Sequence, residues 1–135
     1  MRIGPEDGEA ISFMQELEVR YPEIYPHVFH VPNETRTHIA TAKRLKRMGV
    51  RAGVPDYFIA VPVHGFHGLF IELKAVDRGS CTDHQKEWLS RLALQGYSTT
   101  VAYGAADAIW VLTEYLLHGG LKTFRTRKDA RGARG

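Results

Sequence analysis

GLFIELKA, at residues 68–75, is the stretch of sequence that decides the fold. It reads as a β-strand, and side chains two residues apart on a strand project from the same face. Glu72 and Lys74 therefore point together, whereas Leu69, Ile71 and Leu73 point the other way, into a core. Charged side chains in an apolar strand need a reason, since burying an unpaired charge is costly. We take Glu72 and Lys74 as the centre of a candidate site.

The strand has a partner immediately before it in the chain. Residues 57–63 read as a strand, HGFHG at 64–68 has the composition of a turn, and residues 69–76 return, which predicts an antiparallel hairpin. Asp56 ends the segment GVPD and stands at the entrance to the first strand, so the hairpin brings it towards Glu72. Two plainer interpretations stay open: Asp56 as a turn residue, and Glu72 with Lys74 as a solvated cross-strand pair.

The remaining segments alternate between helices and strands. We expect a helix at 5–21, a short strand at 27–31, a helix from about residue 37 to 48, a helix after the capping box TDHQ at 82–85, a strand at 98–103 and a last helix at 105–117. A helix-connected return from one strand to the next implies a mixed sheet with helices on both faces. The predicted fold is α/β, a mixed β-sheet flanked by helices, in one domain at 1–121, followed by a basic, flexible tail at 122–135.

Length and composition limit the classes of protein. A chain of 135 residues with 44% hydrophobic content can bury one core but is short for two domains. A single cysteine, Cys81, excludes an intramolecular disulfide and suits a reducing compartment. The first residues lack the apolar run of a signal peptide, and no later segment approaches the ~20 apolar residues of a membrane span. We expect an intracellular, cytoplasmic protein that does not enter a membrane.

Positive charge is concentrated in two regions. The formal net charge is +3, but residues 122–135 hold six basic side chains against one acid, so the rest of the chain, with 12 basic and 14 acidic side chains, carries −2. A second basic cluster precedes Asp56 in sequence: Arg36, Lys43, Arg44, Lys46, Arg47 and Arg51. Such patches are typical of surfaces that meet phosphates, and we predict that these side chains contact nucleic acid. The alternative is a solvated helix face plus a floppy tail.

The residue types around the hairpin suit hydrolysis of a phosphodiester. That reaction requires a nucleophile at neutral pH and neutralisation of charge on the phosphate, both of which a bound Mg²⁺ can supply. Mg²⁺ takes oxygen ligands, usually one or two carboxylates together with waters and phosphate oxygens. Asp56 and Glu72 are the candidate carboxylate ligands, and the backbone carbonyl of Leu73 is a further candidate. Lys74 can orient the attacking water or neutralise developing charge, so Asp56, Glu72 and Lys74 are the candidate catalytic residues.

Several motifs in series resemble one family. They are RAGVPD at 51–56, GLFIELK at 68–74, QKEW at 85–88, Gly96-Tyr97 followed by Val101, FHVPN at 29–33 and KRLKRMG at 43–49. Together they resemble the virus-type replication-repair nuclease (VRR-NUC) domain of the PD-(D/E)xK superfamily, in particular its small, stand-alone phage members. The resemblance implies a restriction-endonuclease-like fold, dependence on Mg²⁺ or Mn²⁺ without a small-molecule cofactor, and cleavage of branched DNA in replication and repair, in the bacterial host cell if the protein is phage-derived.

The resemblance also implies an assembly and a substrate. Small members of the family are expected to be homodimers that resolve Holliday junctions. A flap or nicking nuclease, and a non-catalytic nucleic-acid-binding protein on the same fold, are the alternatives. Nothing in the sequence resembles a base-reading helix or a zinc finger, so the shape of the DNA should select the substrate.

Two further site residues follow from the resemblance. The family has a Glu in its first helix, usually with a Gln four residues later; Glu6 fits by register, Ala10 stands where that Gln would be, and Glu9 is the rival. Either glutamate would complete the metal site, whereas an acid near a helix N-terminus also offsets the helix dipole. Gln85 matches a family motif that implies a catalytic role near the scissile phosphate, and the capping box alone also explains a Gln at that position.

Overall fold

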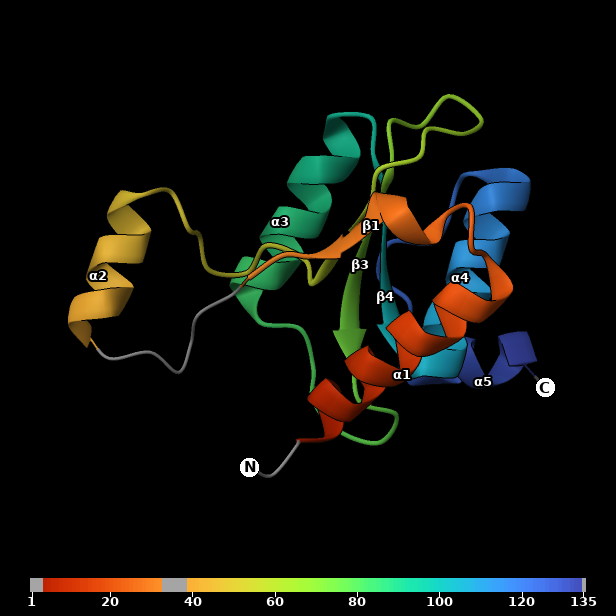
Figure 1. The fold of residues 1–135 in the computed structure, drawn as a ribbon, viewed down its shortest axis with the longest axis horizontal. Coiled ribbons are helices and arrows are strands. Elements are labelled where there is room, and N and C mark those ends of the chain that lie inside the picture. Colours follow the sequence, from red (N-terminus) through yellow and green to blue (C-terminus); the bar gives the residue numbers. More distant parts are fainter. Residues whose placement is uncertain (1–3, 33–38, 135) are drawn as a thin grey trace.

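The computed structural model describes residues 4–32 and 39–134, and a four-stranded mixed sheet lies at its centre (Figure 1). The strands follow the order β1-β2-β3-β4: Val28–His30, Tyr57–Ile59, Leu69–Lys74 and Ser98–Tyr103. β2 is antiparallel to both of its neighbours, whereas β3 and β4 are parallel. The parallel pair is possible because the chain crosses over between these strands through a helix. The predicted α/β fold with a mixed sheet flanked by helices is confirmed.

The hairpin of β2 and β3 is the predicted one, but its first strand is shorter. β2 ends at Ile59, and residues 60–63 leave the ladder before a bridge between Val63 and Phe66 closes the turn. Pro62 explains the early end, because proline has no N–H to donate to a ladder. The register pairs Tyr57 with Ile71, so the next position along places Asp56 opposite Glu72.

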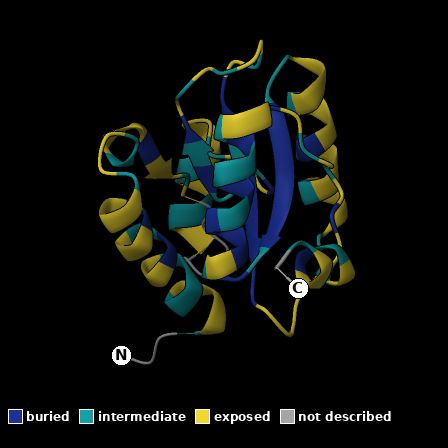
Figure 2. Ribbon diagram, turned by 90° about the vertical axis from the view of Figure 1, so that its right-hand side faces the viewer, coloured by how far each residue is buried: buried dark blue, intermediate teal, exposed yellow. Residues whose placement is uncertain are grey.

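Two helices, α1 (Pro5–Arg20) and α4 (Ala105–His118), cover one face of the sheet. Leu69, Ile71 and Leu73 are buried in one core with residues of both helices, among them Phe13 and Leu112. Figure 2 shows the central strands as the most deeply buried layer, with exposed residues on the outer sides of the helices, whereas β1 at the edge of the sheet is largely exposed. Among the described residues, no helix has the length and apolar character needed to cross a bilayer.

The opposite face of the sheet lies under α3 (Asp83–Leu94). Glu72 and Lys74 project from this face, as predicted, but they are not solvated, because only 2% of Glu72 and 6% of Lys74 is exposed. Thr82 is the N-cap residue of α3. Its hydroxyl accepts a hydrogen bond from the Gln85 N–H, and its own N–H donates to the Gln85 side chain. This pair of bonds is the predicted capping box. Charges on this face therefore act in a less polar medium than surface charges do.

The basic helix α2 (Ile39–Arg47) stands apart from the sheet, on the same side as α3 (Figure 1). A groove of about 460 Å³ separates the two helices, with Leu45 and Val50 on one side and Trp88 and Arg91 on the other. The chain leaves α2 through Gly49, whose φ of 103° is in the region that favours glycine. The first residues of the helix predicted from residue 37 lie outside the described part of the chain.

The C-terminal residues differ from the flexible tail that we predicted at 122–135. Residues 122–126 run along the outer edge of β4, and α5 (Arg127–Arg134) follows. Thr100 Oγ1 donates to the carbonyl of Lys122 at 2.8 Å, and the Tyr103 hydroxyl donates to the carbonyl of Arg125 at 2.7 Å. These contacts cover a strand edge that would otherwise offer its backbone groups to another chain.

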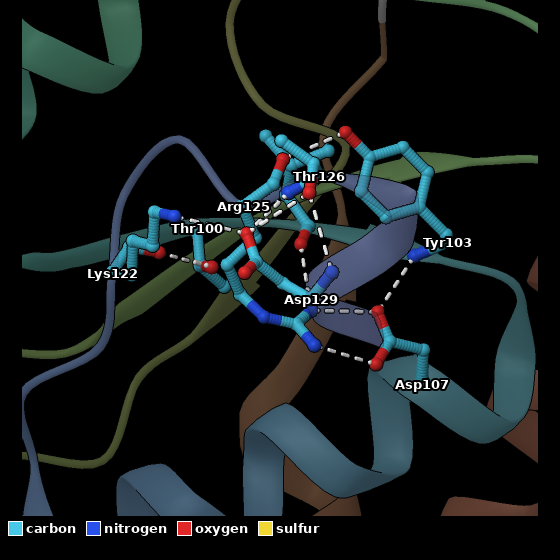
Figure 3. A network of polar contacts seen from close by, with 8 residues as sticks. Thr100, Tyr103, Asp107, Lys122, Arg125, Thr126 and Asp129 are labelled. Carbon is cyan, nitrogen blue, oxygen red and sulfur yellow. Dashed lines mark hydrogen bonds and ion pairs between the residues drawn. The ribbon is translucent and has the colours of Figure 1, made fainter. Parts of the chain in front are cut away.

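A buried ion pair holds this segment in place (Figure 3). Arg125 donates to both carboxylate oxygens of Asp107, at 2.6 and 2.8 Å, and to the carbonyl of Val101 at 3.0 Å. Asp107 Oδ2 also accepts the N–H of Tyr103 at 2.9 Å. Composition predicted flexibility because basic, Gly-containing ends rarely bury enough apolar surface. Here the bidentate ion pair with Asp107 of α4 supplies the order instead.

Candidate active site

Asp56 is held at the mouth of the hairpin by the strand beside it. Its Oδ2 accepts the N–H of Leu73 at 2.7 Å, at a point where the β2–β3 ladder has already ended. The preceding loop packs on the first turn of α3: a Cβ at Gly53 would lie 2.7 Å from the backbone carbon of His84. Gly53 also has a φ of 86°, so both its conformation and its surroundings require glycine. The GVPD segment thus fixes the carboxylate of Asp56 against β3.

The backbone of Leu73 contributes to the same place. In a strand, the N–H and C=O of one residue point to the same side, and the Leu73 N–H points at Asp56. The Leu73 carbonyl therefore faces the side where Asp56 lies. The Leu73 side chain is buried in the core between the sheet and helices α1 and α4.

Glu72 is buried beside Asp56 with one oxygen unsatisfied. Burial first, and then the negative charge of Asp56, raise the pKa of Glu72 to about 9, against the opposing effect of Lys74. Glu72 Oε1 is inaccessible to solvent and accepts no hydrogen bond from any described residue. A hydrogen bond between the carboxyl groups of Glu72 and Asp56 is a further cause of the raised pKa of Glu72. A buried polar atom without a partner is rare and costly in folded proteins, which makes a missing ligand a natural explanation.

Lys74 bridges Glu72 and Gln85. Its Nζ lies 3.4 Å from Glu72 Oε2 and donates to Gln85 Oε1 at 3.0 Å. The same Gln85 oxygen accepts the N–H of Thr82 at 2.9 Å. Gln85 Oε1 therefore takes part in both interactions: it completes the capping box of α3, and it accepts a hydrogen bond from Lys74. A direct role of Gln85 at a phosphate stays a prediction.

The first-helix glutamates are not grouped with Asp56 and Glu72 in the described part of the chain, and a role for either at the metal stays a prediction. Glu9 Oε1 accepts the N–H of Ala105 at 3.3 Å, at the start of α4, where Gly104 has no side chain with which to cap the helix. A carboxylate in that position is stabilised by the helix dipole. Glu6 is exposed in the first turn of α1. The described residues contain no group of three or more His, Cys, Asp and Glu side chains that could hold a metal ion.

Even so, the donor set fits a hard divalent cation. Asp56, Glu72 and the Leu73 carbonyl offer oxygen only, which suits Mg²⁺ or Mn²⁺ and not zinc. Two carboxylates are enough for Mg²⁺, because this ion usually retains several waters and binds substrate phosphate oxygens as well. The unpartnered Glu72 Oε1 is the observation in favour of such an ion.

The predicted DNA-contacting residues are only partly brought to the site. Lys43, Arg44, Lys46 and Arg47 are exposed on α2, and Lys46 lines the groove against α3 together with Arg51. Because α3 also carries Gln85, this basic surface lies on the side of the sheet to which Glu72 and Lys74 point. Arg36 lies outside the described residues.

Sequence reasoning missed Arg127, which contacts the chain immediately after β3. Its guanidinium donates to the carbonyls of Ala75 and Val76. No local pattern could have signalled this contact, because the partners are 51 and 52 residues apart. One arginine among the six basic residues at 122–135 carries no periodicity or motif that would indicate its partner.

A mixed sheet with an Asp at the hairpin mouth and a Glu-x-Lys strand under a capped helix defines an α/β protein of the restriction-endonuclease-like class. Within that class, the model of the VRR-NUC domain family matches residues 6–106, and the chain belongs to this nuclease-type family. A solved structure of a VRR_NUC domain protein is similar, with 30% sequence identity and a TM-score of 0.74, over 93% of this chain and 96% of that one. No functionally curated protein matched.

Proposed function

We propose that this protein is a divalent-metal-dependent endonuclease that hydrolyses phosphodiester bonds in branched DNA. The observation that carries the proposal is the convergence of Asp56, Glu72 and Lys74 at the buried end of the hairpin, where Glu72 Oε1 accepts no hydrogen bond from any described residue. A purely structural acid–base pair would be expected to satisfy its buried oxygens within the protein. Membership of a nuclease-type family supports the same chemistry.

Each residue has a definable task in that reaction. A Mg²⁺ or Mn²⁺ ion held by Asp56, Glu72 and the Leu73 carbonyl would supply charge neutralisation on the phosphate and acidify a water molecule. The Leu73 N–H orients Asp56, and Gln85 with Glu72 fixes the Lys74 ammonium. Lys74 is thus placed to stabilise the charge that develops as the P–O bond breaks and to guide the attacking water. Burial strengthens these interactions because little water competes with them.

The preference for branched DNA is supported by the kind of contacts that the protein offers. Exposed Lys and Arg side chains on α2 suit phosphates, which give position and affinity but carry no sequence information. The substrate must then be selected by its shape. A four-way junction presents two symmetry-related strands, so a twofold homodimer would bring one active site to each. Sedimentation at micromolar concentration should give a dimer; a monomer would rule out paired cutting.

A panel of labelled substrates tests the proposal. A four-way junction, a flap, a fork and a linear duplex are incubated with the protein in Mg²⁺, Mn²⁺ or EDTA. We expect cleavage of the junction that requires the metal and is lost in Glu72→Gln and Lys74→Ala. Products of flap cleavage or nicking, without junction resolution, would favour the alternative flap or nicking nuclease. Binding without metal-dependent cleavage of any substrate, or full cleavage by both variants, would contradict catalysis at this site.

A further inference from the structure

Arg127, the first residue of α5, reaches back to the loop that leaves the Glu-x-Lys strand. Its Nε donates to the carbonyl of Val76 at 2.8 Å, and its Nη2 donates to the carbonyl of Ala75 at 2.9 Å and to that of Arg78. The guanidinium also lies over the ring of Tyr103, 4.7 Å from its centroid. The planar fork of Arg is suited to this grip, because it presents several fixed donors at once.

The gripped loop connects two parts of the candidate active site. Lys74 ends β3 and is followed directly by Ala75, while the far end of the loop leads to Thr82 and so to Gln85. The residues between, 76–80, are exposed and lie outside any helix or strand. Their course decides where α3 begins relative to Lys74, and hence whether Gln85 Oε1 meets Nζ.

Arg127 is itself held rigidly at its own end. Thr126 and Asp129 form a reciprocal cap: Thr126 N–H donates to Asp129 Oδ2 at 2.8 Å, and Asp129 N–H donates to Thr126 Oγ1 at 3.2 Å. Two residues earlier, the buried pair of Arg125 and Asp107 ties the chain to α4 (Figure 3). The cap at the start of α5 and the ion pair fix the backbone at Arg127, and this lets its side chain restrain the loop.

We propose that Arg127 is a positioning residue for the active site, which holds the β3–α3 loop so that Lys74 and Gln85 stay aligned. The inference rests on the proposed nuclease function for its effect on cleavage, but the restraint on the loop is independent of it. The residues that supply the restraint lie beyond 6–106, the range matched by the family model. The C-terminal segment of this chain is therefore a brace for the strand that carries Glu72 and Lys74.

Cys81, the only cysteine of the chain, reports on the loop directly. It is half-buried next to Thr82, so loosening the loop should speed its modification by a thiol reagent such as dithiobis-nitrobenzoate in metal-free buffer. We expect Arg127→Ala to react about fivefold faster or more, because local opening exposes the thiol. Arg131→Ala, an exposed arginine of the same helix, is the control and should react as the wild type does.

Kinetics on the junction substrate give the second readout. Arg127→Ala should lower kcat by about ten- to a hundredfold with KM nearly unchanged, because a small misplacement of a reacting group is sufficient for such a loss. Arg127→Lys should recover part of both readouts, and it also serves if the alanine variant fails to fold. Unchanged Cys81 reactivity in both variants would overturn the proposal, as would a raised KM with unchanged kcat, the result expected of a phosphate contact. An inactive wild type would refute the nuclease function while leaving the thiol measurement decisive for the brace.

Discussion

At the scale of single residues, the protonation of Glu72 is the property with the clearest consequence. Its pKa is raised from 4.5 to about 9 in the folded protein, chiefly by burial. Between these values the folded state holds a proton that the unfolded state has released, so the contribution of Glu72 to stability is greatest below pH 4.5 and falls as pH rises through this window. We expect Glu72→Gln, which cannot ionise, to become increasingly more stable than the wild type from pH 5 to pH 9.

Urea unfolding in EDTA at three pH values measures this difference. The exposed Glu18 offers a matched control, and Glu18→Gln should follow the wild-type pH dependence. Adding Mg²⁺ should stabilise the wild type more than Glu72→Gln, because a ligand that binds only the folded state shifts the equilibrium towards it. Parallel pH curves for the wild type and Glu72→Gln would show that Glu72 is ionised in the folded protein without a metal.

Gln85 allows its two interactions to be separated by mutation. Gln85→Ala removes the bond to Lys74 and one half of the capping box, whereas Thr82→Ala removes only the bond that the Gln85 N–H donates to Thr82 Oγ1. Both should lose about 1 kcal/mol of stability, the usual value of a cap. Only Gln85→Ala should lower kcat, by roughly tenfold, through a loosened Lys74. Equal activity of the two variants would reduce Gln85 to a helix cap.

At the scale of elements, the buried pair of Asp107 and Arg125 joins α4 to the C-terminal segment. Arg125→Met would leave the carboxylate of Asp107 buried without its partner, which costs about 3–5 kcal/mol in comparable pairs. Adding Asp107→Asn should recover part of the loss, because the amide oxygen can still accept the N–H of Tyr103. Lys122→Met, which breaks the exposed pair with Asp129, should cost less than ~1 kcal/mol.

Urea titrations of these three variants and of the wild type at pH 7 decide the point. The pair has a structural role only if the loss in Arg125→Met is several times that in Lys122→Met. A small, equal loss in both would mean that residues 122–134 contribute little to the folded state, as the composition alone had suggested.

Local signals explain which elements the sequence could predict. The β3 pattern, the Thr82–Gln85 capping box and the glycine that ends α2 are encoded within a few residues, and the structure has all three. The hairpin of β2 and β3 was predictable because its two strands are neighbours in sequence. The order of 122–134 was not, since it depends on Arg125 and Arg127 meeting partners 18 to 52 residues away. For the same reason, the sequence did not predict that Glu9 accepts the N–H of Ala105 and so caps α4, because these two residues are 96 positions apart.

At the scale of the whole molecule, the two basic regions lie far apart and differ in how their side chains are engaged. α2 and α5 are at opposite sides of the protein in Figure 1, with the sheet between them. Arg125 and Arg127 donate hydrogen bonds to other groups of the protein, whereas the basic side chains of α2 are exposed. Sequence composition assigned both regions to phosphate contact. The structure leaves α2, beside α3 and on the side to which Lys74 points, as the better candidate.

The salt dependence of DNA binding separates these two surfaces. Each phosphate contact that is lost should reduce the slope of log K against log salt by about 0.9 for duplex DNA. Lys43→Ala with Lys46→Ala should therefore flatten the slope by up to about 2, and weaken binding to junction and duplex alike, because phosphate contacts are not sequence-specific. Lys128→Ala with Arg131→Ala removes the same charge from exposed positions on α5 and should leave the slope nearly unchanged. A flattened slope in the α5 variant alone would instead place the DNA along the C-terminal helix, where Arg127 would have to release the loop before it could contact a phosphate.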